Sequence, residues 1–161
     1  MRRILFALPA LLALLVMSAQ LWAKGDTIRI TIKGGNLAVP IEITDPAVAA
    51  RFHVWTGPGT SPNEPQGLIV DWSRGMATPP KNLPVYQILF LTTRTDRSTY
   101  RVSYVVDPSS NQGYVYLPGT GDEGYEDNVW LIYRGVEGKW FRAWSAWETL
   151  AHPLIAKTEK K

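Results

Sequence analysis

VYQILFLTT (residues 85–93), TYRVSYVVD (99–107) and YVYL (114–117) decide the fold, because each has the pattern of a β-strand and they follow one another closely. The first is mostly apolar, typical of a buried strand, and the second alternates Tyr and Val with polar residues. Between the second and third, residues 108–113 (PSSNQG) have the composition of a turn. Strands joined by short turns pair antiparallel, so this stretch predicts an antiparallel meander.

Shorter strand patterns lie on both sides of the meander. Residues 27–33 (TIRITIK) alternate Ile with polar side chains and predict a half-buried strand, and residues 41–43 (IEI) predict a short return strand. Residues 68–72 (LIVDW) and 139–144 (KWFRAW) predict two more strands. These strands do not alternate regularly with crossover helices, which argues against a parallel doubly wound sheet.

Three segments predict short helices. Asp45 suits the N-cap and Pro46 the first helical position of a helix that ends near Phe52. Apolar residues from Gly124 onward fall on one helical face, with acidic residues at its start and a glycine after its end. Residues 146–155 (AWETLAHPLI) predict a terminal helical turn.

The chain is predicted to form one α+β domain over residues 24–155. It combines the antiparallel meander sheet with two or three short helices, and the sequence has no internal repeat and no low-complexity linker. Residues 156–161 are predicted to be a charged, solvated tail. About 138 residues after the N-terminal segment are enough for one hydrophobic core.

Residues 1–23 have the composition of an export signal. Arg2 and Arg3 give a positive start, an apolar run follows, and small residues near Ala23 offer cleavage sites. Two interpretations stay open: a cleaved signal peptide, or a retained N-terminal anchor, since residues 4–23 are just long enough to cross a bilayer. Both predict a periplasmic or secreted domain, which meets a membrane only through an uncleaved N-terminal segment.

Charge and cysteine content exclude several classes of function. Two of the 17 basic residues lie in residues 1–23, and the other 15 are matched by 14 acidic residues, so nothing indicates a nucleic-acid partner. The chain has no cysteine. A disulfide, a thiol nucleophile, a cysteine-based zinc site and a lipoprotein anchor are therefore excluded, and the core alone must hold the domain together.

The segment 119–124 spells G-x-G-x-x-G, the fingerprint of a dinucleotide-binding loop. In such a site the glycines let the backbone approach a pyrophosphate, whose charge a helix N-terminus then stabilises. Asp122 and Glu123 would repel phosphate, and the preceding strand belongs to a meander rather than to a βαβ unit. We interpret the motif as a turn with an acidic helix start, and predict no cofactor.

The same acidic segment offers oxygen ligands for calcium. Asp122, Glu123, Glu126, Asp127 and Asn128 are all oxygen donors, but the spacing of an EF-hand loop is absent. Acids that stabilise a helix dipole explain them equally well, so we predict no metal site and keep a loose calcium site as the alternative.

Candidate catalytic residues are few. His53 and His152 are the two histidines, and no nucleophile-elbow, zinc-protease or Ser-x-x-Lys motif occurs. Asp71 beside Trp72 resembles a carboxylate in an apolar pocket, as glycosidases use, although an aspartate at a strand end more often caps a turn. The sequence therefore favours a protein that is not an enzyme.

Aromatic residues are the most prominent feature of the chain. Six of its seven tryptophans and all seven tyrosines follow residue 23. Such rings close the core of a small domain, or, beside polar groups, bind sugar rings or peptides at low entropic cost. On a strand, Trp140 and Trp144 would share one face with Arg142 between them. The predicted ligand-binding candidates are Trp55, Trp72, Trp140, Arg142, Trp144 and Trp147.

Four motifs spread over the chain resemble a family of uncharacterised exported bacterial proteins. They are RFHVWTGPGT, GLIVDW, GYVYLPGTGDEGY and RGVEGKWFRAWSAW. The resemblance implies export and a single compact domain. It implies no activity and no catalytic residues.

The leading hypothesis is an exported protein of the bacterial envelope, non-enzymatic, with a binding or structural role and a glycan or an envelope protein as its partner. Its predicted contact surface joins the loop 57–67 to the segment 140–147. One alternative is a hydrolase of envelope glycans with Asp71 or Glu123 as acid or base. The other is an accessory subunit anchored in the membrane by residues 4–23.

Overall fold

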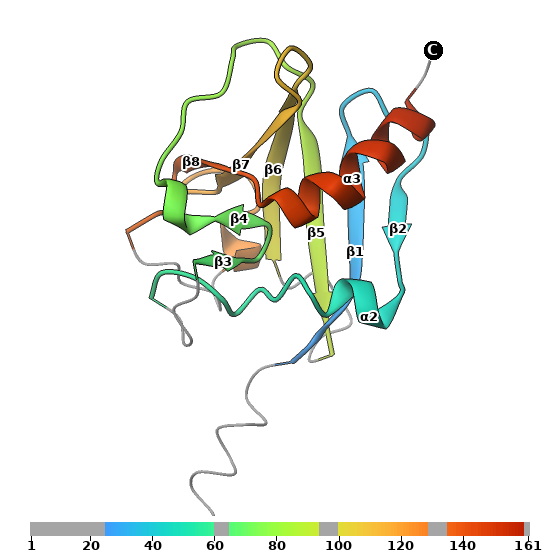
Figure 1. The fold of residues 1–161 in the computed structure, drawn as a ribbon. Coiled ribbons are helices and arrows are strands. Elements are labelled where there is room, and N and C mark those ends of the chain that lie inside the picture. The colour runs from blue at the N-terminus through green and yellow to red at the C-terminus, as the bar shows by residue number, and fades with distance from the viewer. Residues whose placement is uncertain (1–24, 60–64, 94–99, 129–134, 160–161) are drawn as a thin grey trace, which may run out of the picture.

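A six-stranded antiparallel sheet forms the centre of the protein (Figure 1). The computed structural model describes residues 25–59, 65–93, 100–128 and 135–159. The strands lie in the order β2-β1-β5-β6-β7-β8. Their bounds are Thr27–Gly34 (β1), Ile41–Ile43 (β2), Tyr86–Thr92 (β5), Tyr100–Asp107 (β6), Gln112–Leu117 (β7) and Lys139–Arg142 (β8). The predicted α+β class and its antiparallel meander, β5–β6–β7, are confirmed.

Short elements complete the fold. A two-stranded hairpin consists of β3, Gln66–Gly67, and β4, Val70–Asp71. The helices are α2 (Pro46–Ala49) and α3 (Ser145–Thr158), with 3-10 turns η1 (Trp72–Arg74) and η2 (Glu126–Asn128).

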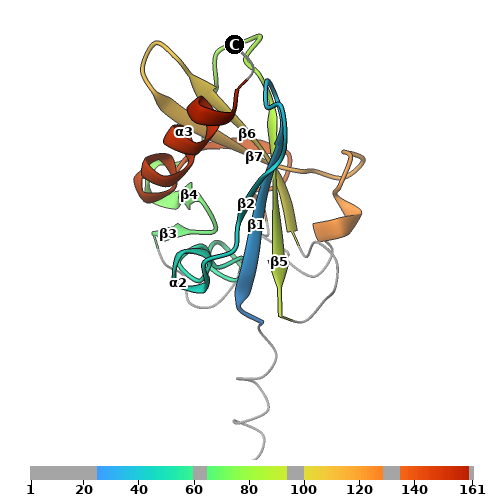
Figure 2. The same cartoon turned by 90° about the vertical axis from the view of Figure 1, so that its right-hand side faces the viewer.

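Different elements lie on the two faces of the sheet. Figure 2 shows α3, α2 and the β3–β4 hairpin on one side, and the orange segment that contains η2 on the other. The inward-facing residues of successive strands, such as Ile32, Ile88 and Val102, are completely buried under the α3 side. This core follows from the alternation of burial along β5, and along β6 as far as Tyr104, because successive side chains point to opposite faces.

The edges of the sheet are short. β2 has three residues and β8 has four. The backbone beside β8 is also engaged, because the Ala77 N–H donates to the carbonyl oxygen of Trp140 at 2.8 Å and Met76 forms a bridge with Phe141.

Helix α3 closes the core. It buries Trp147, Ala151 and Ile155, which recur every four residues and therefore lie on one face. The helix is longer than the turn predicted for residues 146–155, and it continues to Thr158 through a segment predicted to be tail. Pro153 lies inside it, where the ring removes one backbone hydrogen bond without ending the helix.

The strand predicted for residues 68–72 and the helix predicted after Asp45 differ from the structure. Residues 68–72 were predicted as one strand, but Leu68, at a φ of 56°, lies in the turn between β3 and β4. A tertiary contact overrides the strand propensity there: the Leu68 N–H donates to the carbonyl oxygen of His53 at 2.9 Å. Helix α2 begins at Pro46 under an Asp45 cap, as predicted, but ends at Ala49.

The helix predicted from Gly124 onward is only partly within the described residues. Its described portion is the 3-10 turn η2, and residues 129–134 lie outside the described ranges.

Replacing Trp147 by Ala should lower the free energy of unfolding by about 3–5 kcal/mol, because a large, fully buried ring leaves a cavity in the core. Denaturant melts measure this change. Val39, which is 60% exposed, provides the control, and Val39→Ala should change stability by about 0.5 kcal/mol or less. Equal effects of the two substitutions would contradict this account of the core.

Candidate functional site

The sheet separates the predicted binding residues into two groups. Trp140 and Arg142 lie on β8 with their side chains on the face away from α3, because Phe141 between them is buried in the core. The other four candidates lie on the α3 side, within or against the core. They are Trp55, Trp72, Trp144 and Trp147.

Trp147 is a core residue and is not available to a partner. Its exposed fraction is 0%, and its ring packs edge-on against Phe52 and Tyr104, with centroid distances of 5.3 and 6.0 Å. The helix that carries it covers the sheet, so this tryptophan stabilises the fold rather than a contact surface.

Trp144 does not share a face with Trp140, contrary to the expectation from strand alternation. Strand β8 ends at Arg142, and Trp144 is the N-cap of α3. Its N–H donates to the carbonyl oxygen of Ile69 at 2.9 Å, and its ring packs edge-on against Phe52 at 5.7 Å. The turn into the helix therefore moves Trp144 to the core side.

Trp55 lies in a loop and Trp72 in η1, and both pack against the core. The Trp55 indole Nε1–H donates to the carbonyl oxygen of Gly25 at 2.8 Å, and the Trp72 ring packs against Phe141 at 5.3 Å. Residues that follow the loop 57–67 contact the segment 140–147, because Val70 forms a bridge with Ala143. A contact surface that joins the loop itself to this segment stays a prediction. Residues 60–64 lie outside the described part of the chain.

An aromatic surface lies on the opposite side of the sheet. We call Tyr114, Tyr116, Trp140 and Arg142 the outer aromatic face. Across β7 and β8, Tyr114 pairs with Arg142 and Tyr116 with Trp140. All four side chains are partly exposed, and the rings of Tyr116 and Trp140 have their centroids 5.1 Å apart at 42°.

Sequence reasoning did not select the two tyrosines, although YVYL contains the signal. In a strand, Tyr114 and Tyr116 must point to the face opposite Val115 and Leu117.

The glycine-rich loop lies next to this face. Asp122 Oδ2 accepts hydrogen bonds from the Tyr116 hydroxyl and from the Gly119 N–H, both at 2.7 Å. These bonds hold the pKa of Asp122 below its ordinary value, and the same carboxylate raises the pKa of Tyr116. A carboxylate thus occupies a backbone N–H that a phosphate would need, and the loop is a turn that follows an antiparallel strand.

The acids considered for catalysis have structural partners. Asp71 Oδ1 accepts from the N–H of Ser73 at 3.2 Å and from its hydroxyl at 2.5 Å, and so caps η1. Glu123 is 84% exposed and forms an ion pair with Arg101 at 3.4 Å. Within the described ranges, no group of three or more His, Cys, Asp or Glu side chains is placed to hold a metal ion.

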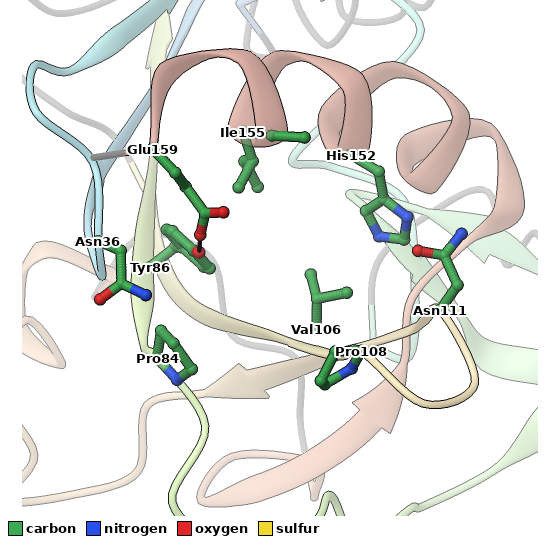
Figure 3. Close-up of a pocket in the computed structure, with 10 residues that line it drawn as sticks. Asn36, Pro84, Tyr86, Val106, Pro108, Asn111, His152, Ile155 and Glu159 are labelled. Carbon is green, nitrogen blue, oxygen red and sulfur yellow. Dashed lines mark hydrogen bonds between the residues drawn. The ribbon is translucent and has the colours of Figure 1, made fainter. Parts of the chain in front are cut away.

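A concave site lies between α3 and the sheet (Figure 3). We call it the α3 groove; its volume is about 490 Å³. It is lined by Asn36, Pro84, Tyr86, Val106, Pro108, Asn111, His152, Ile155, Ala156 and Glu159. The groove brings together segments far apart in sequence, of which only His152 had been considered as a functional residue.

Two tyrosine hydroxyls on the sheet form hydrogen bonds with side chains of the α3 segment. The Tyr86 hydroxyl donates to Glu159 Oε1 at 2.5 Å, and the Tyr104 hydroxyl lies 2.7 Å from His152 Nε2. Burial raises the pKa of Tyr86 and of Tyr104 and lowers the pKa of His152, although Glu148 opposes the last shift. At neutral pH the imidazole is therefore neutral, and its tautomer decides whether Nε2 accepts from the Tyr104 hydroxyl or donates to it.

Comparison of the chain with protein-family models, curated proteins and solved structures finds no match. The resemblance to a family of exported proteins therefore stays a prediction. Within the described ranges no helix has both the length and the apolar character needed to cross a membrane. Residues 1–23, for which a signal peptide or an anchor was predicted, lie outside those ranges.

His152 should make stability depend on pH. Because burial holds its pKa below the ordinary value of 6.5, the unfolded chain takes up a proton at a higher pH than the folded protein does. Stability from this group is complete above about pH 7 and decreases as the pH falls towards 5. Denaturant melts across this range should show a smaller loss for His152→Gln than for the wild type.

The control for this experiment is Val39→Ala, at an exposed position without an ionisable side chain, which should keep the wild-type pH dependence. An unchanged slope in His152→Gln would show that His152 binds its proton equally well in the folded and unfolded states, contrary to the expectation.

Proposed function

We propose that the protein is an exported, non-enzymatic binding domain of the bacterial envelope, which holds glycan chains on the outer aromatic face. The observation that carries this proposal is the pair Tyr116–Trp140, two partly exposed rings fixed at 5.1 Å by the β7–β8 register. Rigid, amphipathic rings of this kind bind with little loss of side-chain entropy.

The chemistry of the face suits a polar ring with an apolar side. A sugar presents C–H groups that pack on an aromatic ring and hydroxyls that need hydrogen-bond partners at its rim. Tyr114 and Tyr116 bring hydroxyls to the same face as the indole of Trp140. The Arg142 guanidinium can donate two parallel hydrogen bonds to a carboxylate, which favours glycans that carry acidic groups.

The positions of Asp71 and Glu123, the two acids considered for catalysis, support binding rather than hydrolysis. A glycosidase needs two carboxyl groups about 5–9.5 Å apart on either side of the scissile bond. Asp71 belongs to the hairpin on the α3 side of the sheet, whereas Glu123 belongs to the segment on the opposite side (Figure 2). These two residues therefore do not flank one bond.

Export is the part of the proposal that rests on the sequence alone. The positive start, the apolar run and the small residues of segment 1–23 support it.

Trp140→Ala should abolish capture of the protein by insoluble envelope glycan while changing the free energy of unfolding by about 1 kcal/mol or less, because the ring lies outside the core. Arg142→Gln should weaken capture by carboxylate-bearing glycan more than capture by neutral glycan. Pull-downs and denaturant melts measure the two effects.

The matched control is Trp144→Phe, which alters a partly exposed tryptophan on the other side of the sheet and should leave capture unchanged. Two results would refute the outer aromatic face as the binding surface. One is that glycan captures the Trp140→Ala variant as fully as the wild type, and the other is that Trp140→Ala lowers stability as much as Trp147→Ala does.

A further inference from the structure

The α3 groove is a concave site that the proposed function does not use. It lies on the α3 side of the sheet, and the outer aromatic face lies on the other side. Its volume of about 490 Å³ falls within the range of about 300–1,000 Å³ that is typical of small-molecule sites.

The middle of the groove is apolar and its polar groups lie towards two ends. Figure 3 shows Val106 and Ile155 between the pair Tyr86–Glu159 at one end and the pair His152–Asn111 at the other. An elongated ligand with an apolar body could therefore contact polar groups at both ends while it covers the apolar walls.

The charge of the lining favours a cation. Of the ten described residues that line the groove, none is Lys or Arg, and Glu159 is the single carboxylate. Glu159 is also the C-cap of α3, at the negative end of the helix dipole. The carboxylate and the helix end attract a positive group and repel an anion.

The Glu159 carboxylate is positioned to accept a hydrogen bond from such a group. The Tyr86 hydroxyl donates to Oε1, fixes the carboxylate and leaves Oε2 as the acceptor for a donor that enters the groove. Tyr86 itself is buried, at 3% exposure, so its position is set by the core.

We propose that the α3 groove binds a small organic cation, a protonated primary amine on an apolar body. The ammonium donates to Glu159 Oε2 beside the end of α3. The apolar body lies along Val106, Ile155 and the ring of Pro108, and a polar group at its far end meets the side-chain amide of Asn111.

Three probes of similar shape test the charge preference: phenethylamine, the neutral 2-phenylethanol and the anionic 3-phenylpropanoate. Titrations of the full-length protein, followed by the amide NMR signals of α3, give the affinities. Phenethylamine should bind at least about tenfold more tightly than either of the other two, because only its ammonium forms a charge-assisted hydrogen bond with Glu159. Equal binding of the three probes would overturn the proposal.

Two isosteric variants locate the ammonium. Glu159→Gln keeps a partner for the Tyr86 hydroxyl but removes the charge, and should weaken phenethylamine binding about tenfold or more. Tyr86→Phe removes the hydroxyl and keeps the charge, so its affinity should stay within about threefold of the wild type. Undiminished binding by Glu159→Gln would place the amine elsewhere and refute the assignment.

Glycan binding at the outer aromatic face and amine binding in the α3 groove are tested by different variants. Trp140→Ala should bind phenethylamine as the wild type does, and Glu159→Gln should keep its capture by glycan. Signal changes confined to β7 and β8 during the amine titration would contradict the groove as the amine site.

Discussion

The edge-on packing of Trp147 against Phe52 and Tyr104 holds the protein together. These three rings come from α3, from the segment after α2 and from β6, so one contact joins α3 and the segment after α2 to the meander. In a chain without disulfides, dispersion and burial of apolar area must supply this closure. The two candidate sites follow from it: the groove lies beside the docked helix, and the aromatic face remains on the side of the sheet that the helix does not cover.

Local patterns in the sequence predicted what local physics determines. Alternation defined β1 and β6, and apolar character defined β5. The Asp45 side chain caps α2 through the Ala47 N–H at 2.9 Å, as its position before Pro46 indicates. The prediction failed where distant contacts decide. The hydrogen bond from Leu68 to His53 bends a segment whose residues favour a strand, and packing on the sheet carries α3 through Pro153.

In the two candidate sites, too, the features set by local sequence could be predicted, and those set by distant contacts could not. The outward direction of Trp140 and Arg142 could be predicted, because it depends only on which neighbours are apolar. The placement of Trp144 could not, since it depends on the residue at which β8 gives way to α3. The groove was invisible in the sequence because its main contact joins Tyr86 and Glu159, 73 residues apart.

The short edge strands have a consequence for the protein at high concentration. An exposed sheet edge offers unpaired N–H and C=O groups to another chain, and long, flat edges lead to aggregation. Here the edge at β2 is three residues long, and the edge at β8 is occupied beside Trp140 by the backbone of Ala77. A neighbouring copy therefore finds few free backbone groups with which to extend the sheet. The protein can display tyrosine and tryptophan on one face of an open sheet and still resist joining its copies edge to edge into fibres.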